Sequence, residues 1–289
     1  MRPTPLPFFR CGLLAALAAM LLAGGCANRP QAPILEQPAG HAAAASAVAG
    51  RLDALLPADV LLLGEQHDAA EHQQIQQQVM AILAARGLLA AVALEMADAG
   101  VSTATLQPGA SEAQVRRELA WNDQAWPWQA YGPAVMTAVR AGVPVLGANL
   151  PRERLQASMA DRQLDGQLRG PALKAQQQLI RSGHCNLLPE GQVTPMTRIQ
   201  IARDISLADT LQQAVLPGKV VVLLAGSGHA DRQLGVPQHL PADLNTTAVR
   251  LRAGPGADDD MAQAFDAVWP TPAVPATDYC AGLKARLGG

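Results

Sequence analysis

Two apolar runs of strand length constrain the fold of this chain, because each ends in glycine and is followed by histidine. Residues 59–65 read DVLLLGE and lead to His67, and residues 219–226 read KVVVLLAG and lead to His229. A continuous apolar run of this length is typical of a strand buried on both faces, as in a parallel sheet covered by helices. The glycine lets the chain turn sharply or lets backbone approach another group closely.

The other expected strands and helices alternate along the chain. Strands are expected at residues 88–96, 143–149 and 246–253, with an edge strand at 265–269. Helices are expected at residues 68–87, 131–141, 151–181 and 195–215, with start signals at Asp68 and at Thr194-Pro195. The alternation predicts an α/β fold: a mostly parallel central sheet with helices on both faces, in a single domain with a helical insertion.

Polar side chains stand at the carboxyl ends of several expected strands. They are Glu65, His67, Glu95, Asn149 and His229. Ligands of parallel sheets bind beyond these ends, so we expect the five groups to share one rim. Two histidines and two glutamates suit either a divalent metal that activates water or a general acid and base. Their spacing matches no familiar zinc motif, and a lone histidine after a strand is more often a packing or turn residue.

Aromatic residues cluster in the middle of the chain. Four of the seven aromatic residues beyond position 25 lie within residues 121–131, namely Trp121, Trp126, Trp128 and Tyr131. The cluster is either a hydrophobic plug under a loop or one wall of a pocket for a flat apolar ligand. In the second case Tyr131 would supply an oxygen ligand or a hydrogen bond.

One face of the helix expected at 195–215 is both polar and apolar. Met196, Gln200, Arg203, Asp204 and Leu207 recur there at three- and four-residue spacing. We expect Arg203 and Asp204 to support the rim from behind rather than to touch a ligand.

The N-terminus predicts export. Two arginines precede CGLLAALAAMLLAGG, which has the length of a signal-peptide core and is short for a membrane-spanning helix. This segment leads into Cys26 within LLAGGCAN, which resembles the lipobox of bacterial lipoproteins, although Ala23 stands where leucine is usual. The prediction is a lipoprotein signal peptide at residues 1–25, a lipid on Cys26 and a flexible tether over 26–50. A plain signal peptide cut at a nearby Ala or Gly is the alternative.

The net charge bears on possible partners. It is −2, and loss of residues 1–25, which hold two arginines and no acidic residue, would make it −4. A mildly acidic chain without a basic run is a poor candidate for nucleic-acid binding.

Two cysteines remain beyond the leader and Cys26. They are Cys185 and Cys280. In an oxidising periplasm they are expected to form a disulfide that ties the C-terminal tail to a loop in the middle of the chain. Two buried free thiols are the alternative.

The motifs together resemble one family. Segments similar to LLLGEQHDAAEHQQIQQQVM, ALEM, WPWQAYGPAV, VLGANLPRE, SGHCNLLP and LLAGSGHA occur in this order in the ChaN family of bacterial haem-binding lipoproteins. The resemblance covers residues 55–285, and the paired Gly-Glu-x-His and Gly-x-Gly-His elements are its most specific part.

The resemblance implies a periplasm-facing outer-membrane lipoprotein that binds haem through tyrosine, as a homodimer, in haem or iron uptake. Residues 51–289 would form the haem-binding domain. Tyr131 is the expected iron ligand, because Tyr279 lies in the C-terminal tail, and Arg152 or Arg154 would pair with a haem propionate.

The family's rim residues correspond to Glu65, His67, Glu95 and His229. Tiki metalloproteases and erythromycin esterases belong to the same superfamily. The alternative function is therefore a periplasmic hydrolase that uses these four residues, with a divalent metal or by Glu/His chemistry alone. A lipid-anchored scaffold without a ligand is a third hypothesis.

Overall fold

A computed structural model of the chain describes residues 39–255 and 263–287. The predicted signal peptide at residues 1–25, the lipidation site Cys26 and the beginning of the tether lie outside these residues. All of the strands expected from the sequence lie within them.

The predicted tether is not flexible chain throughout. Helix α1 spans Ala39–Asp53, and its residues Val48 and Leu52 are buried in the main core. A helix of this length is marginal in water by itself, so these packed side chains hold it in place. The part of the predicted tether from residue 39 onward is therefore helical.

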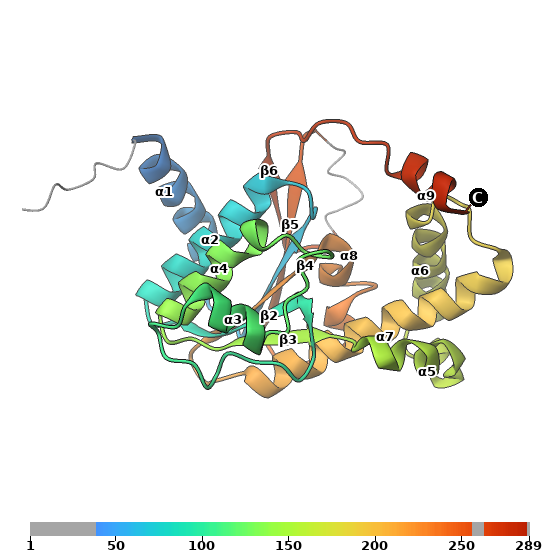
Figure 1. Ribbon diagram of the computed structural model, residues 1–289, viewed down its shortest axis with the longest axis horizontal. Helices are drawn as coiled ribbons and strands as arrows, with labels where there is room; N and C mark the ends of the chain where they lie inside the picture. Colours follow the sequence, from blue (N-terminus) through green and yellow to red (C-terminus); the bar gives the residue numbers. More distant parts are fainter. Residues whose placement is uncertain (1–38, 256–262, 288–289) are drawn as a thin grey trace, which may run out of the picture. The chain divides into compact units, whose positions relative to one another are not determined.

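Six parallel strands form the central sheet in the order β3-β2-β4-β1-β5-β6 (Figure 1). They are β1 (Val60–Glu65), β2 (Leu89–Asp98), β3 (Val145–Asn149), β4 (Val220–Gly226), β5 (Thr246–Ala253) and β6 (Ala267–Thr271). The predicted α/β class and parallel sheet are confirmed, and the expected edge strand is β6.

The longer helices are α2 (Ala70–Ala85), α4 (Trp128–Arg140), α6 (Gly170–Gly183) and α7 (Glu190–Ala214). Shorter ones are α3 (Glu112–Glu118), α5 (Leu155–Ala160), α8 (Ser227–Ala230) and α9 (Tyr279–Leu287), with 3₁₀ turns η1 (Arg152–Arg154), η2 (Arg162–Gly166) and η3 (Val236–His239). No described helix combines the length and apolar character needed to span a bilayer.

Alternate side chains of the central strands enter two separate cores. Leu61 and Leu63 pack with α2 and α4 on one face of the sheet. Val60 and Leu62 pack on the other face with Leu207 of α7. All of these strand side chains are fully buried, and each contributes about 1.5–3 kcal/mol to folding. The continuous apolar runs thus arise because both faces of the sheet are covered.

The helical insertion, residues 150–219 between β3 and β4, is divided differently from the prediction. The helix expected at 151–181 is broken into α5 and α6, and Pro171 lies in the first turn of α6, where proline is favoured. Helix α7 begins at Glu190, so Pro195 lies inside it and the predicted start at Thr194-Pro195 is wrong. The insertion has its own small apolar cluster, which includes Leu164 and Ile201.

The strand order brings the two Gly-His motifs together. Strand β4 lies between β1 and β2, and Glu65 at the end of β1 is in register with Gly226 at the end of β4. Because the strands are parallel, the groups that follow β1, β2 and β4 emerge at one edge of the sheet.

Candidate functional site

The two Gly-His motifs fit into each other, and each glycine makes room for the other motif. A Cβ atom on Gly64 would lie 2.9 Å from both Ser227 Cα and Ala230 Cβ. A Cβ atom on Gly226 would lie 2.8 Å from His67 Nε2. Both distances are shorter than Cβ contacts in proteins, so close approach explains both glycines.

Glu95 lies between the two histidines, which do not contact each other directly. Its Oε2 accepts a hydrogen bond from the Gly226 N–H at 2.7 Å and lies 3.8 Å from His67 Nε2. Its Oε1 lies 3.4 Å from His229 Nε2. Burial by itself would raise the pKa of Glu95, but the charges of His229 and His67 outweigh it and lower the pKa to about 2. Glu95 is therefore an ionised carboxylate on the floor of the site.

His229 is enclosed by carboxylates. Its Nδ1 donates to Asp204 Oδ1 at 2.5 Å, and Gln200 Nε2 lies 3.2 Å from the same nitrogen. Burial opposes a charge on this imidazole, but Glu95 and Asp204 together raise the pKa of His229. The imidazolium form is favoured, with each ring nitrogen directed at a carboxylate.

Glu65 holds the other half of the floor. Its Oε1 accepts hydrogen bonds from Tyr131 Oη and from His67 Nδ1, both at 2.7 Å. Its Oε2 accepts from Gln73 at 3.0 Å and from Gln76 at 2.8 Å. Each oxygen of this buried carboxylate thus accepts two hydrogen bonds, which fix the neighbouring side chains. The bond to Nδ1 orients His67 with its Nε2 towards Glu95.

His67 is the accessible histidine of the pair, with 39% of its side chain exposed. Its ring meets Trp126 edge-on, with centroids 4.9 Å apart. Burial lowers the pKa of His67, but the hydrogen bond to Glu65 and the charge of Glu95 outweigh it, so the pKa is raised.

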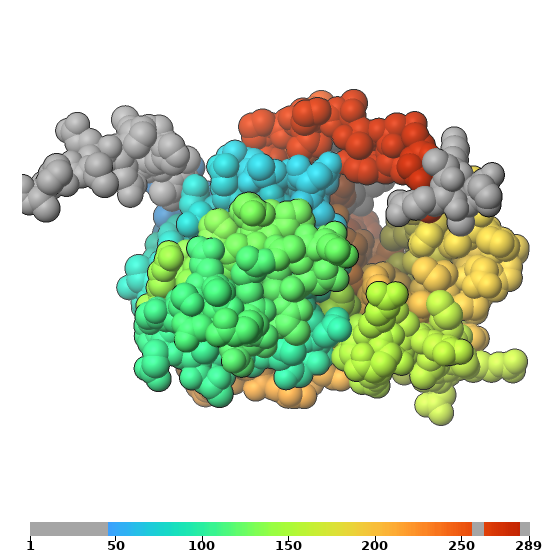
Figure 2. All heavy atoms as spheres, in the orientation of Figure 1, coloured from blue at the N-terminus to red at the C-terminus, as the bar shows by residue number. Residues whose placement is uncertain are grey.

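An open cavity of about 670 Å³ lies above this floor. Figure 2 shows this face hollowed between the C-terminal segment and the helices of the insertion. The charged and polar side chains along it come from β1 and the loop after it, from β2, α7 and α8, and from the tail: Glu65, Gln66, His67, Asp68, Glu95, Gln200, Arg203, Ser227, His229 and Tyr279. Such a volume is usual for a small-molecule site.

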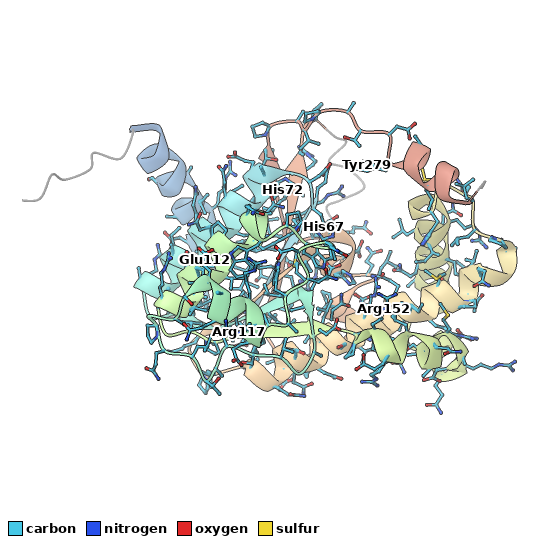
Figure 3. All side chains as sticks on the ribbon, in the orientation of Figure 1. His67, His72, Glu112, Arg117, Arg152 and Tyr279 are labelled. Carbon is cyan, nitrogen blue, oxygen red and sulfur yellow. A yellow bond between two sulfur atoms is a disulfide. The ribbon has the colours of Figure 1, made fainter. Side chains whose placement is uncertain are left out.

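A second cavity of about 470 Å³ adjoins the first and shares Glu95 and Arg203 with it. Trp126 and Arg152 also line it. The Arg203 Nε is buried without a hydrogen-bond partner, and neither arginine side chain forms an ion pair with any residue that the structure describes. Figure 3 shows His67 and Tyr279, which line the first cavity, and Arg152, which lines the second, around the open space in the middle of the view.

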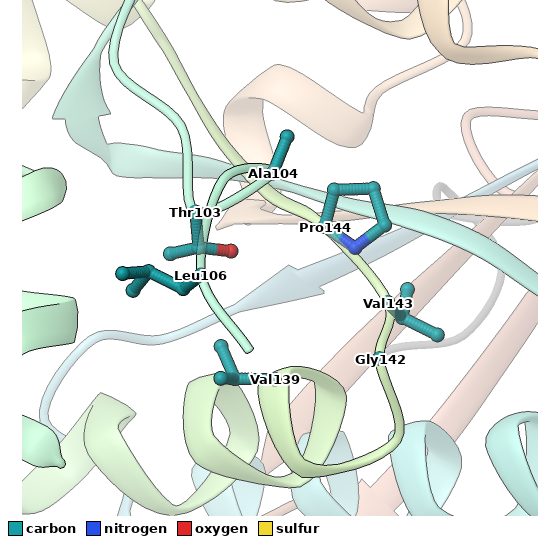
Figure 4. Close-up of a pocket in the computed structure, with 7 residues that line it drawn as sticks. All are labelled: Thr103, Ala104, Leu106, Val139, Gly142, Val143 and Pro144. Carbon is teal, nitrogen blue, oxygen red and sulfur yellow. The ribbon is translucent and has the colours of Figure 1, made fainter. Parts of the chain in front are cut away.

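A third hollow differs from this site because its side chains are apolar apart from Thr103. It has a volume of about 90 Å³ and lies between residues 103–106 and 139–144 (Figure 4). Its one side-chain hydroxyl, on Thr103, accepts the Val145 N–H at 2.9 Å. No charged group lines it.

The chain matches the model of a known protein family. A family model described as "Haem-binding uptake, Tiki superfamily, ChaN" matches residues 51–240. This chain is a member of the ChaN family. The resemblance found from its motifs is therefore confirmed.

Two solved structures are similar to this ChaN-family chain. One, described as "Cofacial heme binding to ChaN of Campylobacter jejuni", has a TM-score of 0.63 and 24% identity over 76% of this chain and 90% of that chain. It shows that the fold is shared. A Bacillus cereus protein matches with a TM-score of 0.42 and 11% identity over 72% of this chain and 69% of that chain, which supports no functional argument. Comparison with curated proteins gave no match.

Tyr131 lies beneath the cavity rather than in it. Only 1% of the residue is exposed, and its hydroxyl is bound to Glu65. Burial first, and then the Glu65 charge, raise the pKa of Tyr131. An iron ligand has to reach the open space as phenolate, and both effects oppose this, so its placement argues against Tyr131 as the ligand.

Tyr279 is the tyrosine at the cavity. It is 60% exposed and donates its hydroxyl to Asp68. Asp68 does not cap helix α2 as expected: the N-cap residue is Ala69, without a side-chain bond, and Asp68 instead accepts from Gln66 at 2.9 Å and from Tyr279. No local pattern in the sequence predicts this contact, which joins residues 211 positions apart.

Other rim and aromatic residues have mainly structural roles. Asn149 donates to the Glu95 carbonyl at 2.8 Å and so supports the end of β2. Trp121 and Trp128 are bound to Trp126 O and to Glu112, which makes most of the aromatic cluster a plug. Trp126 alone of the cluster lines one of the two adjoining cavities.

The prediction for the face of α7 is right for one residue and incomplete for another. Asp204 supports the rim from behind through His229. Arg203, which was also expected behind the rim, lines both cavities. Arg154 lines a separate cavity of about 320 Å³.

The alternative of a divalent metal is not supported. Among the residues that the structure describes, no three His, Cys, Asp or Glu side chains are grouped so that they could hold a metal ion. Both nitrogens of His229 are directed at carboxylates, so this imidazole has no lone pair directed into the cavity. Hydrolysis by Glu and His alone stays a prediction.

The Glu95→Gln variant tests the ion pair between Glu95 and His229. The pKa of His229 is raised in the folded state. The charged imidazole therefore contributes in full to the free energy of unfolding below pH 6.5, and this contribution is lost as the pH rises through the folded-state pKa. Without the Glu95 charge the folded-state pKa of His229 should be lower, so the stabilisation should be lost at a lower pH. The variant should also be about 2–4 kcal/mol less stable near neutral pH. Urea denaturation at a series of pH values measures both effects.

Asp53→Asn is the matched control, since Asp53 forms an exposed ion pair with Arg86. Its effect should be within about 1 kcal/mol, with the pH profile of the wild type. A Glu95→Gln profile parallel to that of the wild type above pH 6.5 would show that the pair does not raise the pKa of His229.

Proposed function

We propose that this protein binds haem in the cavity beneath Tyr279 and acts in bacterial haem or iron uptake as a lipid-anchored homodimer at the outer membrane. The observation that carries the proposal is an exposed tyrosine at the mouth of a cavity of about 670 Å³, in a chain of the haem-binding ChaN family. Tyr279 replaces Tyr131 as the proposed iron ligand.

The chemistry of Tyr279 supports this role. Tyrosine oxygen is an established ligand of ferric haem. The bond to Asp68 raises the pKa of Tyr279, so the phenol is protonated until iron takes the place of its proton. Binding should therefore release a proton, and the Asp68 carboxylate keeps the phenol oxygen at the cavity beforehand.

The arginines supply the other end of the site. Haem is a flat apolar molecule with two carboxylates, and a guanidinium binds a carboxylate through paired hydrogen bonds. Arg203 lies between the two adjoining cavities, and Arg152 borders the second. We assign the propionates to this side, with Trp126 and Leu155 as apolar surroundings.

The homodimer is proposed from the openness of the site. Tyr279 approaches haem from one side, and the other face of the ring would remain in contact with water. A second copy of the chain could cover that face, which would bury apolar surface. Cofacial haem binding is described for the similar Campylobacter jejuni protein.

Tyr279→Phe tests the iron ligand. The soluble domain should shift the Soret band of haemin with a defined stoichiometry, and the tyrosinate-to-iron charge-transfer band should be lost in the variant. Haemin affinity should fall by about tenfold to a hundredfold. Light scattering of the complex gives its mass and tests the dimer.

The matched control is Tyr131→Phe, which removes the same oxygen from the buried tyrosine. It should keep the charge-transfer band. If Tyr131→Phe loses the band and Tyr279→Phe keeps it, the ligand is Tyr131. A wild type without any saturable Soret shift would overturn the proposed function.

Arg203→Gln tests propionate recognition with a second ligand, haemin dimethyl ester. The ester has no carboxylates. The variant should therefore bind haemin about tenfold more weakly than the wild type does, and it should bind the ester with the affinity of the wild type. Arg154→Gln should leave both affinities unaltered, since Arg154 lines another cavity. Equal losses for haemin and its ester would place the propionates elsewhere.

Cys26→Ser tests the lipid anchor. Cells that express the full chain with labelled palmitate should incorporate label into the wild type and not into the variant. The variant should also leave the membrane fraction. Label that survives the substitution would favour a different attachment site, and absence of label in both would favour the plain signal peptide.

A further inference from the structure

The segment that carries Tyr279 has little packing of its own. From Pro272 to Leu283 no side chain is buried. The segment leaves the sheet at Thr271, the last residue of β6, and Tyr279 follows about eight residues later. Extended chain of that length reaches up to about 28 Å, so without further restraint Tyr279 could move far from the cavity.

A disulfide supplies this restraint at the adjacent residue. Cys280 is bonded to Cys185, 95 positions earlier in the chain, with Cα atoms 5.7 Å apart. Cys185 follows the end of α6, in the turn that leads into α7. The cross-link thus fastens the tail to the insertion, whose helix α7 carries Arg203. Figure 1 shows α9 of the tail beside α6.

The backbone at Cys185 has a conformation that favours glycine. Helix α6 ends with the Cys185 N–H bonded to Ser182 O and the Asn186 N–H bonded to Arg181 O, the pattern of a Schellman motif. Cys185 has φ +59° at the site in this motif where glycine is usual. A side chain is therefore kept there at a conformational cost.

We propose that the Cys185–Cys280 disulfide is a positioning device for haem capture, which holds Tyr279 at the cavity opposite Arg203 before haem arrives. The proposal rests on the proposed function, with Tyr279 as iron ligand. Binding to an ordered tyrosine avoids the entropy loss of immobilising the tail, so the cross-link raises affinity without touching haem.

The test compares the oxidised wild type with Cys185→Ser/Cys280→Ser, which avoids thiols that would themselves bind iron. Haemin affinity should fall by about tenfold. A second variant, Cys185→Gly/Cys280→Ser, removes the same cross-link but places the favoured glycine at the end of α6, and it should show the same loss. Circular dichroism checks that both variants fold.

The same changes in a Tyr279→Phe background separate positioning from general stability. There the loss of the disulfide should have no further effect on haemin affinity. An equal loss in both backgrounds, or wild-type affinity in either cysteine variant, overturns the proposal.

A measurement without haem distinguishes failure of this inference from failure of the proposed function. The bond to Asp68 raises the pKa of Tyr279, and Tyr131 is buried with its pKa raised further, so the first phenol to ionise is Tyr279. Its ultraviolet titration should move towards the ordinary tyrosine pKa of about 10 when the disulfide is removed. An unchanged titration refutes the positioning role even if haem binds, and a wild type that binds no haem refutes the proposed function whatever the titration shows.

Discussion

The buried carboxylate of Glu95 is the contact on which the rest of the site depends. It receives the Gly226 N–H from β4 and lies between His67 and His229, so three strand ends converge on one side chain. A buried anion is stable only when cations and donors surround it. The same need explains why Gly226 has no side chain, since a Cβ there would reach His67.

The charged groups of the floor hold one another in place through hydrogen bonds and ion pairs. Glu65 is used fully by Tyr131, His67, Gln73 and Gln76. His229 is enclosed between Glu95 and Asp204. Groups committed to one another in this manner have little capacity left to ligate a metal ion. Tyr279 and Arg203 line the cavity around this network, and His67 is its most exposed histidine.

Much of the fold and the floor could be predicted from the sequence, because the signals were local. Apolar runs on strands buried from both sides indicated the strands, and the parallel-sheet rule placed Glu65, His67, Glu95 and His229 on one rim. The order of the strands had no local signal, so the insertion of β4 between β1 and β2 was not foreseen. Helix starts failed at Asp68 and Pro195 for a similar reason, since tertiary contacts override capping preferences.

The positions of the two tyrosines could not be predicted for the same reason. Tyr131 lies in an aromatic cluster and Tyr279 in an apparent tail, and sequence distance favoured the first. Two long-range contacts reverse this order: Glu65 holds the Tyr131 hydroxyl in the interior, while Asp68 and the neighbouring disulfide hold Tyr279 at the cavity. The sheet therefore supplies a fixed floor, and the cross-linked tail places Tyr279 at the cavity above it.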